Sequence, residues 1–100
     1  MIRHTVVFKL KHATGSDAEL DFLRSAQKLA TAISVVKNFE NLRQTSNKNN
    51  YDFGLSMEFA SAADYHTYNE HPIHVQFVET RWIPEVVDFM EIDYEPYTTT

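Results

Sequence analysis

The segment IRHTVVFKLK, residues 2–11, decides how this chain of 100 residues folds. Its residues alternate between two faces, and a period of two with several β-branched residues is typical of a β-strand with one apolar side. The side predicted to face the core holds Ile2, His4, Val6, Phe8 and Leu10. The opposite side holds Arg3, Thr5, Val7, Lys9 and Lys11. We therefore expect other elements to pack on the first side only.

The next part of the chain supplies a helix and further strands. Ser16 and Glu19 form a capping box, and the apolar stripe after them predicts a helix to about residue 34. Hydrophobic patterning and turn-prone flanking residues predict strands at 36–44, 51–59 and 86–95.

A second helical region lies before the last of these strands and is broken by proline. Ser61 with Asp64 predicts a short helix that ends near Asn69. Pro72 cannot continue that helix, but it is well placed as the first residue of a new one. We expect this second helix to stop before Pro84.

The element order β-α-β-β-α-β predicts an α+β fold. A four-stranded antiparallel sheet with helices on one face, in the ferredoxin-like manner, satisfies this order. One domain over residues 1–96 with a tail at 97–100 is expected.

The uncovered face of this sheet predicts a partner. It carries Thr5, Val7, Gly54 and Ser56, a set too apolar for an ordinary wet surface. We expect a second copy of the chain to cover it, which predicts a homodimer in the form of a dimeric α+β barrel.

Composition excludes several classes of protein. The formal net charge of −5 argues against a nucleic-acid-binding protein, which needs a basic face. The absence of cysteine excludes disulfides, thiolate nucleophiles and cysteine-ligated metals. No segment approaches the roughly 20 apolar residues of a membrane span, and the first residues lack the apolar run of a signal peptide. We therefore expect a cytoplasmic protein.

Charge is distributed unevenly along the chain. The first fifty residues hold eight basic and four acidic side chains, whereas the last fifty hold one and ten. Glu91, Asp93 and Glu95 share one face of the last strand, which neighbours the first strand in this fold. They either pair with the basic residues of the first strand or remain solvated. His12 and His66 are expected to be exposed.

A histidine in the apolar stripe of the first strand points to a cavity. Burying an unpaired polar group costs roughly 1–3 kcal/mol, so His4 must be paired or line a hollow. The helix break lies over the sheet in this fold, so His4, Tyr68 and His74 are predicted to converge on one small-molecule pocket. The predicted substrate-binding residues around it are Phe8, Phe22, Leu23, Phe53, Leu55, His71, Phe77 and Trp82.

These three polar residues suggest acid–base chemistry. The positive end of the helix that begins at Pro72 disfavours a charged His74, and a neutral imidazole is a competent general base. Tyr68 is placed to donate a hydrogen bond to a developing enolate oxygen, with His4 orienting one of the two. The matching reaction is proton abstraction next to a carbonyl, as in aldol cyclisation, isomerisation or a lyase step, with no cofactor.

A structural interpretation of the same residues stays open. His74 can tether the backbone at the helix start, Tyr68 can simply pack its ring, and His4 can hold the helix break on the sheet. His71 and His74 have the spacing of a metal pair. The break separates them and no further ligand set appears, so no metal site is predicted.

Three stretches, in the right order, resemble the stress-responsive A/B barrel domain (Dabb) family. Residues 2–11 resemble its first strand, residues 71–74 (His-Pro-Ile-His) its His-Pro-x-His motif, and residues 86–94 its last strand with a closing Asp-aromatic pair. The resemblance covers almost the whole chain. It implies a ferredoxin-like fold and a dimeric α+β barrel.

The resemblance also implies chemistry. Olivetolic acid cyclase, a plant polyketide cyclase of this family, performs an aldol condensation without a cofactor. Its catalytic histidine and tyrosine fall on His74 and Tyr68, and a further histidine of its site falls on His4. A third-strand histidine of that site is Phe53 here, which removes a polar group from the cavity. Other members are stress-induced proteins, and related dimeric barrels are cofactor-free monooxygenases.

The preferred hypothesis is a homodimer with one apolar pocket per subunit for a carbonyl-bearing or aromatic small molecule, with cofactor-free cyclase, isomerase or lyase chemistry. The alternatives are a non-catalytic stress-response dimer and, less favoured, a cofactor-free monooxygenase.

Overall fold

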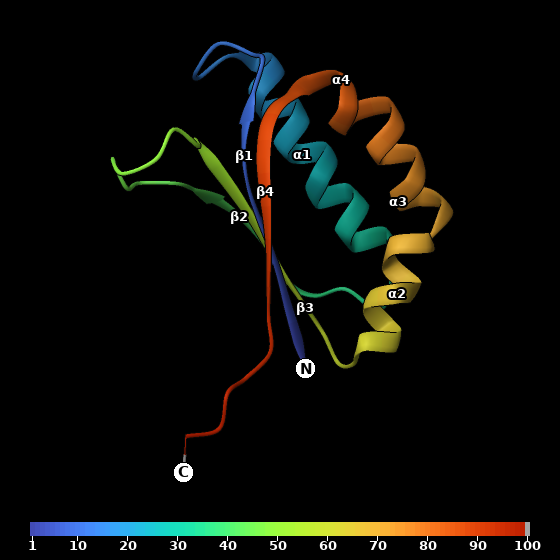
Figure 1. Ribbon diagram of the computed structural model, residues 1–100. Coiled ribbons are helices and arrows are strands. Elements are labelled where there is room, and N and C mark those ends of the chain that lie inside the picture. The colour runs from blue at the N-terminus through green and yellow to red at the C-terminus, as the bar shows by residue number, and fades with distance from the viewer. Residues whose placement is uncertain (100) are drawn as a thin grey trace.

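The computed structural model describes residues 1–99 and contains one sheet with helices on one side (Figure 1). A π-helical segment, η1, lies within the second helical region. In chain order the elements are β1 (Ile2–Leu10), α1 (Asp17–Ala32), β2 (Lys37–Arg43), β3 (Phe53–Phe59), α2 (Ala62–Glu70), α3 (Pro72–Phe77), η1 (Val78–Trp82), α4 (Ile83–Glu85) and β4 (Val86–Tyr94). The end of the predicted tail, Thr100, lies outside the described residues.

The four strands form one antiparallel sheet in the order β2-β3-β1-β4. This confirms the predicted α+β, ferredoxin-like fold. Val6 of β1 lies opposite Leu55 of β3 and Glu91 of β4. Residues directly opposite one another share a face of a sheet, so all three lie on the helix side.

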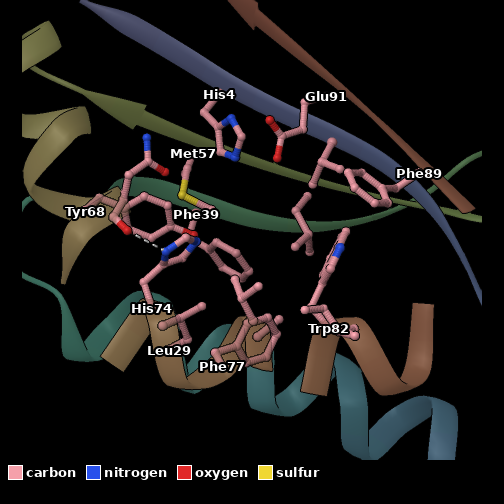
Figure 2. A pocket seen from close by; sticks show the side chains of 16 residues that line it. His4, Leu29, Phe39, Met57, Tyr68, His74, Phe77, Trp82, Phe89 and Glu91 are labelled. Carbon is pink, nitrogen blue, oxygen red and sulfur yellow. Dashed lines mark hydrogen bonds between the residues drawn. The ribbon is translucent and has the colours of Figure 1, made fainter. Parts of the chain in front are cut away.

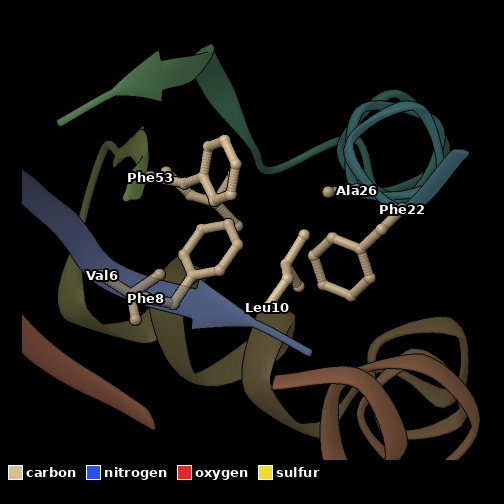
Figure 3. Close-up of a cluster of buried hydrophobic side chains, with 7 residues drawn as sticks. Val6, Phe8, Leu10, Phe22, Ala26 and Phe53 are labelled. Atoms are coloured by element: carbon tan, nitrogen blue, oxygen red, sulfur yellow. The ribbon is translucent and has the colours of Figure 1, made fainter. Parts of the chain in front are cut away.

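The core lies between β1, β3 and α1 (Figure 3). Phe8 has no solvent exposure, and its ring centroid lies 5.8 Å from Phe22, 5.6 Å from Phe53 and 5.1 Å from Trp82. A second buried cluster lies nearer the α2 end of the sheet and contains Leu29, Ile33, Met57, Phe59 and Tyr68.

The expectation that the second helix stops before Pro84 is wrong, because the chain stays helical to Glu85. Proline lacks an N–H and clashes with the carbonyl four residues earlier in a regular α-helix. The π-helical segment η1 changes the hydrogen-bond register just before it, with the Ile83 N–H bonded to the Val78 carbonyl. This wider turn lets the proline follow without ending the helix.

Of the two alternatives for the acidic residues of β4, pairing with the basic residues of β1 is not formed by Glu91 or Asp93 within residues 1–99. Asp93 lies opposite His4 and Glu91 lies opposite Val6, so both carboxylates lie on the helix side of the sheet. A one-residue change of register moves a side chain to the other face. The basic residues find acidic partners elsewhere: Arg3 pairs with Glu58 at 3.7 Å and Lys9 with Asp52 at 3.2 Å.

His12 is not exposed as predicted but belongs to a charged cluster at the end of the second helical region. Its Nε2 lies 2.6 Å from Glu85 Oε1, and Arg81 Nε lies 2.6 Å from Glu85 Oε2. Arg81 also contacts Asp21 of α1 at 2.8 Å, and the Lys11 N–H donates to the Glu85 carbonyl. Glu85 therefore ties the helix-to-strand junction to the end of β1.

Replacing Glu85 with alanine should destabilise the fold by about 1–3 kcal/mol, because it leaves two donors in a largely buried site without their acceptor. The Glu85 and His12 side chains are only 14% and 16% exposed. The matched control is Glu70→Ala, which removes an exposed histidine–carboxylate pair with His66 and should cost less than about 0.5 kcal/mol. Urea unfolding measures both, and equal costs would contradict the assigned role of Glu85.

In the described part of the chain, residues 1–99, all helices lie on one face of the sheet and the other face is left uncovered (Figure 1). On β4 it presents Met90, which is 47% exposed, and Ile92, opposite Val7 and Thr5 of β1. An apolar sheet face without cover is typical of an interface. None of the helices within residues 1–99 has the length and hydropathy needed to cross a membrane.

Candidate functional site

A cavity of about 320 Å³ lies between the helix side of the sheet and helices α1 and α3 (Figure 2). This volume is at the lower end of the range of roughly 300–1,000 Å³ for small-molecule sites. Its walls are mostly apolar. The titratable and amide side chains that line it are His4, Tyr68, Asn69, His74 and Glu91.

The structure brings some of the predicted residues together and leaves others out. His4, Tyr68 and His74 line one cavity, along with Leu55, Phe77 and Trp82. Phe8, Phe22 and Phe53 do not line it, because they pack against one another in the core, with Leu23 at the edge of that cluster. The His71 side chain is also absent from the cavity, because it accepts the Ile73 N–H at 3.1 Å and caps α3.

The helix break at His71-Pro72 places Tyr68 next to His74. His71 has extended backbone angles, with φ −62° and ψ 133°, and its N–H donates to the Tyr68 carbonyl. The chain then restarts as α3, so residues on either side of the break face the same cavity. The ring centroids of Tyr68 and His74 are 4.3 Å apart. Figure 2 shows the two side chains next to each other.

Of the two ring nitrogens of His74, only Nδ1 makes a hydrogen bond within residues 1–99. His74 Nδ1 lies 3.1 Å from the Asn69 carbonyl oxygen. A carbonyl only accepts hydrogen bonds, so Nδ1 carries the proton in the neutral ring and Nε2 keeps its lone pair. This is the protonation state required of a general base.

Burial keeps both members of this pair uncharged. It lowers the pKa of His74 below its usual 6.5, with a smaller effect of His4 in the same direction opposed by the Asn69 carbonyl and Glu91. Burial, followed by the neighbouring Tyr65 and Glu91, raises the pKa of Tyr68 above its usual 10.0. The sequence predicted a neutral His74, and the lowered pKa agrees with that prediction. The main cause is desolvation, whereas the prediction relied on the helix dipole. At neutral pH the site holds a neutral imidazole and a protonated phenol.

His4 is held by residues that the sequence analysis did not select. Its Nδ1 lies 2.6 Å from Asp93 Oδ1 and 2.9 Å from Tyr65 Oη, and Tyr65 donates to Asp93 Oδ2 at 2.9 Å. Within residues 1–99, His4 makes no hydrogen bond to Tyr68 or His74, so the predicted orienting contact is not formed. Because the carboxylate only accepts hydrogen bonds, Nδ1 of His4 carries a proton and donates it to Asp93.

Asp93, Glu91 and Tyr65 were missed for identifiable reasons. The two carboxylates were expected on the opposite face of the last strand, an error of one residue in its register. Tyr65 precedes Tyr68 by three residues on α2, and residues at that spacing lie on neighbouring parts of one helix face. That spacing is the signal that points to Tyr65.

Among the residues that the structure describes, no group of three or more His, Asp or Glu side chains is arranged to hold a metal ion. His71 and His74 use their Nδ1 atoms for backbone contacts on either side of the helix break.

The chain matches the model of a known protein family and resembles several solved structures. The family model for the stress responsive A/B barrel domain (Dabb) matches residues 2–96. A Dabb family protein with a ferredoxin-like fold from Mesorhizobium loti is 58% identical, with 97% of each chain covered and a TM-score of 0.95. No curated protein matches the chain.

More distant structures share the fold. A dimeric ferredoxin-like protein of unknown function from Thermobifida fusca is 22% identical, with 95% of this chain and 90% of that chain covered and a TM-score of 0.78. A hydroxynitrile lyase from Passiflora edulis is 14% identical, with 99% and 95% covered and a TM-score of 0.86.

Proposed function

Because the chain belongs to the stress-responsive A/B barrel (Dabb) family, we propose that it acts as a homodimer with one small-molecule pocket in each subunit. The dimer is supported by the uncovered apolar face of the sheet and by the dimeric Thermobifida neighbour. In this arrangement the two sheets face each other. The helices and the pockets beneath them then lie on the outside.

The proposed chemistry is cofactor-free proton abstraction next to a carbonyl, the step shared by cyclases, isomerases and lyases of this kind. The observation that carries it is the contact between a protonated Tyr68 and a neutral His74 in an apolar cavity. The hydroxynitrile lyase neighbour supports the view that this fold accommodates lyase chemistry. The ligand would be a carbonyl-bearing or aromatic molecule that fits the cavity.

Each residue of the pair has one role in this proposal. The Tyr68 hydroxyl donates to the carbonyl oxygen of the ligand, and His74 Nε2 removes the proton from the adjacent carbon. The C–H bond breaks, an N–H bond forms on His74, and the electron pair moves to the carbonyl oxygen as an enolate. The enolate carbon then attacks an electrophile or regains a proton from His74.

Exchange of carbon-bound protons tests this step without knowledge of the natural substrate. We expect the protein to accelerate deuterium incorporation into the methyl group of acetophenone in D₂O, as followed by proton NMR. His74→Gln should reduce the acceleration by about 100-fold and Tyr68→Phe by at least about tenfold. Because the pKa of His74 is lowered, the rate should fall with acid only below pH 6.5.

His66→Gln is the matched control, because it removes an exposed histidine on α2 that does not line the cavity. It should exchange at the wild-type rate. Wild-type exchange no faster than in buffer, or unchanged in His74→Gln, would contradict the proposed chemistry.

A second candidate function is a non-catalytic stress-response dimer. It is favoured by one observation: His71 caps α3 and His74 bonds the Asn69 carbonyl, so both histidines fasten the helix break. In that case His74→Gln should lower the melting temperature while the wild-type protein shows no exchange activity.

A further inference from the structure

One acidic side chain distinguishes the cavity from a simple apolar pocket. Glu91 lies on β4 opposite Val6, a position that directs its side chain to the helix side of the sheet. It lines the cavity, and Figure 2 shows its carboxylate next to His4.

Nothing in the cavity wall neutralises this carboxylate. The lining includes no lysine or arginine, and within residues 1–99 Glu91 takes part in no ion pair. Asp93 differs, because it is already bonded to His4 and Tyr65. The cavity thus has one negative charge without a partner at the end formed by β1 and β4.

The hydrogen-bonding groups are also unequal at the two ends of the cavity. Near β1 and β4, the Glu91 carboxylate only accepts hydrogen bonds. At the helix break, Tyr68 donates and Nε2 of a neutral His74 accepts. A complementary ligand therefore has an acceptor, such as a carbonyl oxygen, at the Tyr68 end and a donor at the Glu91 end.

We propose that Glu91 is a specificity-determining residue, which makes the pocket select ligands with an ammonium or other hydrogen-bond-donating group on an apolar or aromatic body and reject carboxylates. This inference rests on the proposed function, because it assumes that the cavity binds a small molecule. To the proposed function it adds the charge that the bound molecule should carry. An anion would meet an unpaired carboxylate at short range, where like charges repel each other.

Three probes with the same ring and different charges test the proposal. Benzylammonium, benzyl alcohol and benzoate are titrated into the full-length protein at pH 7.5, and binding is followed by the ring-proton NMR signals of His4 and His74. We expect affinity to fall in that order, with benzylammonium at least about tenfold tighter than benzoate. In Glu91→Gln the preference should fall to about twofold or less.

Glu79→Gln is the control, since it removes the same charge from a residue of η1 that does not line the cavity. It should keep the wild-type preference. If benzoate binds the wild-type protein as tightly as benzylammonium, or if Glu91→Gln keeps the full preference, the assignment of Glu91 is overturned while the pocket stands. If no probe binds the folded protein, the proposed ligand site fails, and this inference fails with it.

Discussion

Replacing Phe8 with alanine should lower the free energy of unfolding by about 3–5 kcal/mol, which is the usual cost of emptying a buried phenylalanine site. Phe8 is fully buried, and its ring contacts those of Phe22, Phe53 and Trp82, which come from three other elements. No neighbour can fill the space without breaking contacts of its own. At about 4–8 °C per kcal/mol for a domain of this size, the melting temperature should fall by more than about 12 °C.

Calorimetry or thermal circular dichroism measures this loss. Tyr97→Ala is the control, because it removes an aromatic ring that is 89% exposed, and it should change the melting temperature by no more than about 2 °C. A small loss in Phe8→Ala would mean that the cluster of aromatic rings does not hold the helices on the sheet.

The second large effect concerns assembly. Met90→Lys should weaken the proposed dimer by at least about 100-fold, because each copy would place an ammonium group in an apolar interface without a partner. Met90 is on the uncovered face of the sheet, opposite Val7. Sedimentation at micromolar concentration should show wild-type dimers and Met90→Lys monomers.

Leu20→Lys provides the matched control, since Leu20 is 45% exposed on α1, away from the sheet face. It should sediment as the wild-type protein does. Wild-type monomers at the same concentration would contradict the dimer without affecting the fold of the subunit.

Much of the fold could be predicted because local signals agree with one another. The alternation around Val6 defines a strand with one apolar side, and Ser16 and Ser61 cap the two helices as their capping boxes predict. Pro72 starts α3, as its missing N–H and fixed φ favour. Pro84 was misjudged because a π-helical turn depends on contacts with the sheet and α1, which local propensity does not contain.

The site was predictable only in part. His4, Tyr68 and His74 meet in one cavity because each belongs to an element whose buried face is readable from its pattern or from the proline break. The residues that form the cavity wall were harder to predict. In the sequence they have the same apolar character as Phe8 and Phe22, which fill the core. Only packing distinguishes a filled space from an empty one.

The sequence by itself determined the elements, their order, the sheet with one covered face and the residues able to do acid–base chemistry, since these follow from local periodicity, caps and side-chain identity. Only the tertiary structure decided which partners those residues have. His4 pairs with Asp93 and His12 packs against Glu85, and the residues of each pair are more than 70 positions apart in the sequence. Glu91 reaches the cavity because β4 pairs with β1. Such contacts depend on strand register and packing, and a register shift of one residue reverses every face.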